Sequence, residues 1–141
     1  MRPLAVLAVA GAVLLGGSSA APGEVRVRFS GLTGGGQVSV ALFADQASWR
    51  RREGAAQSVL RPVSGGGAET VFSGVRPGRY AIMAYHDRNG DGRLNTNAVG
   101  LPQEPYGFSN DARGPFGMPP GWRPSQFEVT ADGAVQTIRL R

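Results

Sequence analysis

Cysteine and lysine are both absent from this chain of 141 residues, and histidine occurs only once, as His86. Without cysteine the chain forms no disulfides, which many small exported domains use to hold their loops together. One histidine and no cysteine also leave too few ligands for a zinc or copper site. A bound cation with oxygen ligands is another way to fasten loops in a small domain.

All fifteen basic residues are arginines, and the formal net charge is +5. An arginine-rich surface can bind phosphate, because the guanidinium group forms paired hydrogen bonds with it. Here the arginines are scattered, and only residues 50–52 form a run. Nucleic-acid-binding domains usually gather their basic residues on one face, so we expect no nucleic-acid partner. Codon bias in a GC-rich genome is the simpler interpretation of the preference for arginine over lysine.

The only long apolar run is Leu4–Leu15, which follows the basic start Met1-Arg2. Small residues come next, up to Ala20 and Ala21. This layout is typical of a secretory signal peptide, and the run is too short for a membrane span, which needs about 20 apolar residues. We therefore expect a signal peptide at residues 1–20 and a single mature domain at residues 21–141. That domain would be periplasmic or secreted, with no lipid-modified cysteine and no transmembrane span.

Glycine and proline are frequent, with 22 and 10 residues respectively, which favours strands joined by turns over a helical fold. Alternating apolar residues predict two hairpins, one at each end of the domain, the second turning at Asp132-Gly133. Asp45 or Ser48 would cap one short helix that ends at Gly54. Strand 79–86 is apolar on both faces and should be central. The predicted strands are 24–30, 37–43, 58–63, 68–72, 79–86, 126–130 and 134–140.

About seven short strands with regular turns predict an all-β fold, an antiparallel β-sandwich of immunoglobulin-like or transthyretin-like type. Residues 87–121 show no regular period, so they form one long irregular loop. A loop of this length inside a compact domain is usually functional or organised by an ion.

The stretch from His86 to Asn97, HDRNGDGRLNTN, opens this loop. It places oxygen-bearing side chains at Asp87, Asn89, Asp91 and Asn95, with Gly92 after the third. These are the offsets of a calcium loop, in which position seven, here Arg93, supplies its backbone carbonyl. Position twelve is Ala98 instead of the usual glutamate, and no helices flank the loop. The motif is therefore not an EF-hand.

A carboxylate from elsewhere would have to complete the calcium site, and the candidates are Glu104 and Asp111. With few carboxylates the site should be weak, with a dissociation constant of roughly 10⁻⁴ to 10⁻³ M. The same residues can also form a tight turn without metal, because Asp and Asn side chains bond to nearby backbone N–H groups. The sequence leaves both interpretations open.

Four further residues are candidates for ligand binding: His86, Tyr106, Phe108 and Trp122. His86 would act as a general base only if it were accessible, and its neighbour Asp87 points to the opposite face of a strand. A structural role for His86 is the simpler interpretation. The three aromatic residues can present a surface to a sugar, or they can anchor the long loop to the core.

The segment FSGVRPGRYAIMAYHDRNGDGRLNTNAVGLPQEPYGFSNDARG resembles an uncharacterised family of exported bacterial domains. The shared pattern is G-x-Y-A at Gly78–Ala81, H-D-x-N-x-x-G-x-L-x-T-N from His86, and G-x-P-x-E-x-Y-G-F-S-N from Gly100. The resemblance implies an exported all-β domain and implies no particular activity.

The combined prediction is an exported, non-enzymatic β-sandwich in which an Asp/Asn-rich loop is organised by a weakly bound structural Ca²⁺. Its partner would be an unknown envelope or extracellular ligand. One alternative is a small hydrolase that uses His86 with Glu104 or Asp111. Another is a carbohydrate-binding module that uses the aromatic residues of the loop. The sequence assigns no catalytic residue and no oligomeric state.

Overall fold

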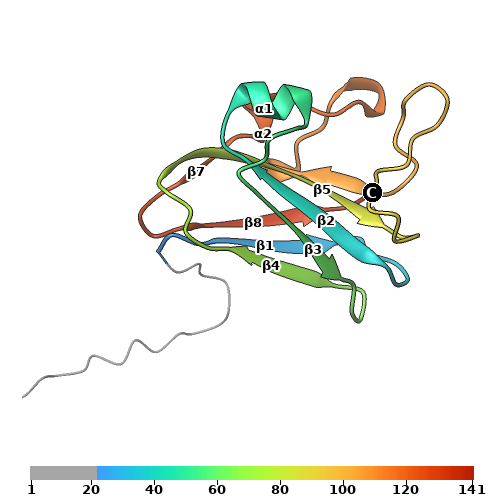
Figure 1. Ribbon diagram of the computed structural model, residues 1–141, viewed down its shortest axis with the longest axis horizontal. Coiled ribbons are helices and arrows are strands. Elements are labelled where there is room, and N and C mark those ends of the chain that lie inside the picture. The colour runs from blue at the N-terminus through green and yellow to red at the C-terminus, as the bar shows by residue number, and fades with distance from the viewer. Residues whose placement is uncertain (1–21) are drawn as a thin grey trace, which may run out of the picture.

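Two β-sheets packed face to face make up the protein in a computed structural model, which describes residues 22–141. Figure 1 shows the two layers, with the short helices above the larger sheet. An all-β sandwich is therefore confirmed. The predicted signal peptide, residues 1–20, lies outside the described residues.

The smaller sheet has three strands in the order β4-β1-β8. Strand β1 pairs antiparallel with β4 and parallel with β8, so one pairing departs from the antiparallel prediction. Alternate residues of β1 are buried, as its sequence pattern predicts. The strand bounds are Val25–Ser30 for β1, Ala68–Phe72 for β4 and Ala134–Arg139 for β8.

The larger sheet is centred on β5, the ten-residue strand Gly78–Asp87, which is the strand predicted to be central. Strand β2 lies along one side of β5, and β3 pairs with β2. Strands β6 and β7 pair with the other side of β5, at separate places. The remaining bounds are Gln37–Phe43 for β2, Gln57–Pro62 for β3, Tyr106–Phe108 for β6 and Phe127–Val129 for β7.

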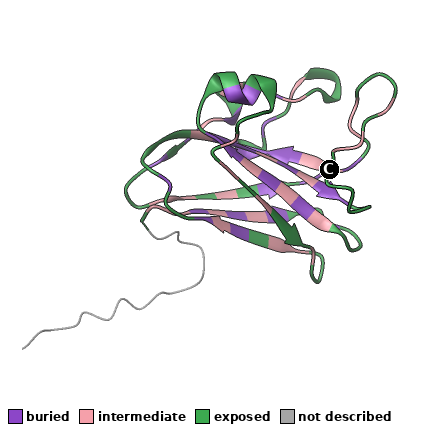
Figure 2. Ribbon diagram, in the orientation of Figure 1, coloured by how far each residue is buried: buried purple, intermediate pink, exposed green. Residues whose placement is uncertain are grey.

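The main core fills the space between the sheets with side chains such as Val27, Val40 and Ile82, all fully buried. A second apolar cluster lies on the outer face of the larger sheet and includes Trp49 and Phe108. Figure 2 shows buried and less buried positions alternating along the strands, which is the pattern of a sheet covered mainly on one face. The short helices are α1 (Gln46–Arg51), α2 (Trp122–Ser125), η1 (Ser109–Asp111) and η2 (Pro115–Gly117).

Helix α1 begins at the predicted cap, Asp45. The Asp45 carboxylate accepts hydrogen bonds from the backbone N–H of Ser48 at 2.8 Å and from its hydroxyl at 3.0 Å. These two bonds lower the pKa of Asp45. The helix ends at Arg51 and not at Gly54, and its C-terminal cap is Arg52, which takes the left-handed conformation with φ 56°.

Both predicted hairpins are wrong. Strands β1 and β2 belong to different sheets, and so do β7 and β8. The Asp132-Gly133 turn does form, with the N–H of Gly133 bonded to the carbonyl of Thr130 at 3.0 Å, but it carries the chain from one sheet to the other. Alternation shows that each strand has one buried face, and it does not say which of two facing sheets holds the strand.

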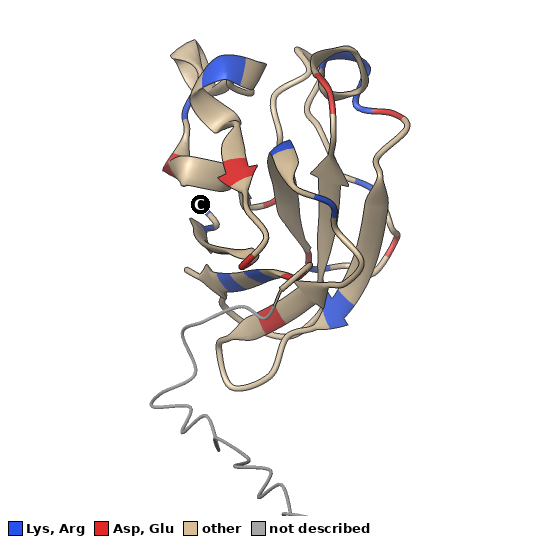
Figure 3. Cartoon of the chain, turned by 90° about the vertical axis from the view of Figure 1, so that its left-hand side faces the viewer, with Lys and Arg blue, Asp and Glu red and all other residues tan. Residues whose placement is uncertain are grey.

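Charged residues are spread over several elements, and both signs are interspersed in Figure 3. On the small sheet, Arg26 and Arg28 of β1 form ion pairs with Glu69 of β4. The hydrogen bond from Arg26 is the main cause that lowers the pKa of Glu69. Within residues 22–141, no helix has the length and apolar character needed to cross a membrane.

Candidate metal site in the β5–β6 loop

The Asp/Asn-rich stretch begins where β5 ends and runs into an irregular loop, residues 88–105, that returns to β6. Three backbone contacts close this loop at its base and middle. The N–H of His86 bonds to the carbonyl of Pro105 at 2.8 Å, that of Gln103 bonds to Asn95 at 2.7 Å, and Thr96 forms a β-bridge with Pro102. The loop is thus folded back on itself, and its two halves face each other.

Asp87, the last residue of β5, is the centre of the first half. Its side chain is fully buried. One carboxylate oxygen accepts from the N–H of Asp91 at 3.2 Å, and the other accepts from the N–H of Gly92 at 2.8 Å. The side-chain amide of Gln37, on β2, donates to the second oxygen at 3.1 Å. These bonds hold the carboxylate in one orientation and turn the chain tightly around it.

Asp91 lies at the exposed side of the same turn. Its carboxylate accepts from the N–H of Arg93 at 2.9 Å and from the Asn95 side-chain amide at 3.0 Å. The Asn89 amide lies 3.4 Å from Asp91 and 3.3 Å from the Asn95 oxygen. The bonds from Arg93 and Asn95 lower the pKa of Asp91, so the carboxylate is charged at neutral pH.

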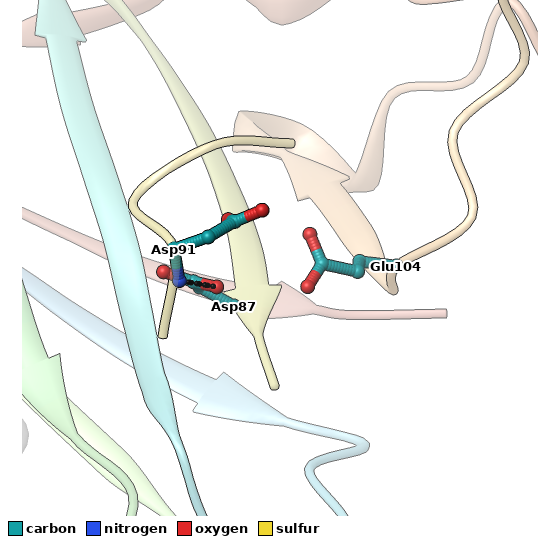
Figure 4. A group of neighbouring side chains, drawn as sticks. All are labelled: Asp87, Asp91 and Glu104. Carbon is teal, nitrogen blue, oxygen red and sulfur yellow. Dashed lines mark hydrogen bonds between the residues drawn. The ribbon is translucent and has the colours of Figure 1, made fainter. Parts of the chain in front are cut away.

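Glu104 closes the site from the second half of the loop. It is 8% exposed, and its two oxygens accept from the backbone N–H groups of Arg88 and Asn95, each at 3.2 Å. One carboxylate oxygen each from Asp87, Asp91 and Glu104 lie within 4.8 Å of one another. Figure 4 shows the Asp91 and Glu104 side chains pointing toward each other, with Asp87 beside them.

Of the two residues proposed to complete the site, the structure brings in Glu104 and not Asp111. Asp111 belongs to η1 and is exposed. Its carboxylate lies 2.8 Å from the guanidinium of Arg141 and 3.4 Å from that of Arg113. It is therefore already paired with cations and is not grouped with Asp87.

Arg93 is exposed within the loop, and its N–H is used by Asp91. Among the described residues, no hydrogen bond uses its carbonyl oxygen, which is the atom that the sequence pattern assigns to a cation. Of the predicted carboxylate ligands, Asp87, Asp91 and Glu104 thus converge, with Asp87 and Glu104 buried and Asp91 open to solvent.

Two residues of this site were missed by the sequence analysis. Gln37 reaches Asp87 only because β2 and β5 pair in a register that places the two residues opposite each other. Tyr85 lies two residues before Asp87, on the same strand face, and its hydroxyl donates to the Gly92 carbonyl at 2.9 Å. The alternation of β5 was the available signal for Tyr85, whereas nothing local marks Gln37.

The three carboxylates also affect the pKa of Tyr85. Burial is the main cause that raises the pKa of Tyr85 above its ordinary value of 10.0, and the negative charges of Asp87, Glu104 and Asp91 raise it further. A hydrogen bond with Ser39 acts in the opposite direction. Tyr85 therefore responds to the charge of the loop, although it is not itself a ligand.

His86 is fully buried on the core side of β5. Its Nε2 lies 2.6 Å from the carbonyl oxygen of Gly35, which can only accept, so Nε2 carries the proton. Ser109 is also fully buried, and its hydroxyl bonds to the N–H of Ile82 and the carbonyl of Ser125. Neither side chain is placed to contact a substrate in solution, so the geometry gives the hydrolase alternative no support.

The loop aromatics pack inward. Phe108 is 2% exposed and makes edge contacts with Trp49 and Tyr106, at ring-centroid distances of 5.9 and 5.6 Å. Trp122 is half-buried against Trp49, whose Nε1 donates to the carbonyl of Pro120 at 3.1 Å. Trp49 is therefore the centre of this cluster. Anchoring of the loop to the outer face of the larger sheet accounts for these contacts.

Fold and site together define an all-β sandwich with a carboxylate-lined loop between its central strand and β6. Residues 27–138 match the model of a bacterial family described as "Uncharacterized protein conserved in bacteria (DUF2141)". The match covers most of the chain, so the chain belongs to this family, and the resemblance seen in the sequence is confirmed. No curated protein and no solved structure matches the chain.

Proposed function

We propose that this protein is an exported, non-enzymatic binding domain whose β5–β6 loop is organised by one Ca²⁺. The observation that carries the proposal is the convergence of Asp87, Asp91 and Glu104, whose oxygens lie within 4.8 Å of one another. None of the ion pairs among residues 22–141 involves these three carboxylates. Like charges at this separation repel each other, and a cation among them removes the repulsion.

The donor set favours Ca²⁺ over other metals. Ca²⁺ takes six to eight oxygen ligands in flexible geometry, and the loop offers carboxylates, the amide oxygens of Asn89 and Asn95, and the Arg93 carbonyl. Mg²⁺ prefers a rigid octahedron with several waters. Zinc prefers nitrogen and sulfur ligands, and the single histidine, His86, is bonded to Gly35.

The proposed effect of Ca²⁺ is to fasten two parts of the loop that are far apart in sequence. Asp87 and Asp91 come from the turn after β5, whereas Glu104 comes directly before β6. A shared cation would tie the end of one strand to the start of the next, which suits a domain that has no cysteine. Export is supported by the signal-peptide pattern at residues 1–20.

Thermal unfolding with Ca²⁺, with Mg²⁺ and with chelator tests the metal claim. A ligand that binds only the folded state at a hundredfold excess over its dissociation constant stabilises it by about 2.7 kcal/mol. For a domain of this size that corresponds to a rise in melting temperature of roughly 10 °C. Asp91→Asn should remove most of the rise, and Asp111→Asn should keep it. Identical melting curves with Ca²⁺ and with chelator would refute the proposal.

A further inference from the structure

The outer face of the larger sheet is hollowed between α1 and the β5–β6 loop, two elements whose positions Figure 1 shows. Three adjoining hollows share two lining residues, Met83 at the centre of β5 and Arg52 at the end of α1. The largest has a volume of about 330 Å³. Because the same two residues line all three, we describe them as one groove, the Met83–Arg52 groove.

The floor of the groove is apolar. Ala41 and Phe43 come from β2, Met83 comes from β5, and Phe108 of β6 closes one end. Leu94 forms the wall on the side of the metal loop. Ligand sites are usually concave, mainly apolar and equipped with a few polar groups, and volumes start at about 300 Å³. The Met83–Arg52 groove meets that description.

The charged residues that line the Met83–Arg52 groove are all arginines. Arg52 lines every part of the groove and Arg50 lines one part, whereas none of the three hollows is lined by Asp or Glu. Within residues 22–141 the Arg52 guanidinium forms no ion pair. An unpaired guanidinium at the edge of an apolar groove complements a ligand that has an apolar body and one anionic group.

The backbone of Arg52 is in the left-handed conformation. Arg52 has φ 56°, and its N–H caps α1 by bonding to the carbonyls of Ser48 and Trp49. Glycine is the usual residue at such a helix end, because it has no Cβ to strain the left-handed conformation. An arginine here keeps a strained backbone and gains a charged side chain over the groove, a combination typical of binding sites.

We propose that the Met83–Arg52 groove binds a small amphiphilic monoanion, with its apolar body over Met83 and its carboxylate or sulfonate on Arg52. Leu94 and Thr96 of the β5–β6 loop also line the groove, so the groove adjoins the proposed metal site. The test is therefore run once in Ca²⁺ and once in chelator, and each variant is compared with wild type under the same condition.

The test uses 1-anilinonaphthalene-8-sulfonate, which has an apolar aromatic body and one sulfonate, as a fluorescent probe of the folded protein. Fluorescence should rise on binding, and octanoate should displace the probe more effectively than octanol, which lacks the charge. Arg52→Gln should weaken probe binding about tenfold or more, because a hydrogen-bonded charge is lost. Arg51→Gln is the matched control, since Arg51 is the last residue of α1, directly precedes Arg52, is exposed and lines none of the hollows.

Arg52→Gly provides a second, independent readout. It should raise the melting temperature by relieving the left-handed backbone, and it should still lose probe binding. Loss of binding in a more stable protein separates the groove from a general loss of fold. Equal binding by wild type and Arg52→Gln, or an equal loss in Arg51→Gln, would overturn the proposal. Neither outcome bears on the calcium proposal, because each compares an arginine variant with wild type under one metal condition.

Discussion

Tyr85 donates its phenolic proton to the carbonyl oxygen of Gly92 at 2.9 Å, so that a residue of the central strand holds the turn of the carboxylate loop. The same tyrosine senses the negative charge of Asp87, Glu104 and Asp91. This relationship joins the rigid sheet to the proposed metal site, and it makes Tyr85 a reporter of what happens there.

Calcium should therefore lower the pKa of Tyr85. Burial raises that pKa first and the carboxylates raise it further, and a bound cation cancels the second contribution. Ultraviolet titration of tyrosinate, taken as the difference between wild type and Tyr85→Phe, measures the shift. An unchanged Tyr85 titration in saturating Ca²⁺ would show that the cation does not bind near these carboxylates.

The raised pKa also sets how the metal-free protein responds to alkali. Because the folded state keeps the Tyr85 proton longer than the unfolded state, this contribution to stability is complete below about pH 10 and is lost as pH rises through the folded pKa. Tyr85→Phe should therefore lose less stability over that range than wild type. Denaturant unfolding at neutral and alkaline pH measures the difference.

The loss of stability at acid pH should depend in part on Asp91. Its pKa is lowered in the folded state, chiefly by the N–H of Arg93 and the amide of Asn95. The stability that this provides is present above the unfolded pKa and is lost as pH falls through the folded value. In chelator, Asp91→Asn should show a smaller drop in melting temperature than wild type between about pH 5 and about pH 3. Parallel pH profiles for the two proteins would contradict the assignment.

Gly36 should be intolerant of a side chain because of its contact with the site. A Cβ on Gly36 would lie 2.5 Å from the carbonyl oxygen of Asp87. Gly36→Ala should therefore cost about 1–3 kcal/mol more than Gly34→Ala. Gly34 has a similar positive φ but open space around it, so it controls for backbone strain. Equal losses of unfolding free energy in the two variants would show that the contact is unimportant.

The buried hydroxyl of Ser109 should stabilise the fold. It satisfies the N–H of Ile82 and the carbonyl of Ser125, so Ser109→Ala leaves two buried groups unpaired and should cost about 2 kcal/mol or more. Thr70 is the matched contrast, because its buried hydroxyl has no partner among the described residues. Thr70→Val should be neutral or stabilising. Denaturant unfolding measures the free energy of unfolding of both variants. An unchanged free energy of unfolding in Ser109→Ala would contradict the stabilising role of the hydroxyl.

The sequence predicted most strands and the first half of the site because both are local patterns. Alternation marks the buried face of β1, and the spacing of Asp87, Asn89 and Asp91 marks a turn with converging oxygens. Strand β6 was not predicted because its three residues lie inside a stretch without periodicity. A strand of that length carries too little pattern to be recognised alone.

The arrangement of the strands in two sheets and the second half of the site depend on pairing between strands far apart in sequence. Which sheet receives β1, and that β8 runs parallel to it, follow from packing of the two layers rather than from either strand. The choice between Glu104 and Asp111 depended on where the loop returns. Glu104 directly precedes β6, so the pairing of β6 with β5 places it near Asp87 at the end of β5. Asp111 follows β6 and lies beside Arg141 instead.

The most direct test of the calcium site is calorimetric titration of Ca²⁺ into wild type, Glu104→Gln and Asp111→Asn. Wild type should show one site with a dissociation constant of roughly 10⁻⁴ to 10⁻³ M. The affinity should be at least about tenfold weaker in Glu104→Gln, because one carboxylate is lost, and unchanged in Asp111→Asn. No binding by folded wild type at about 10 mM Ca²⁺, ten times the weakest constant expected, would contradict the calcium proposal.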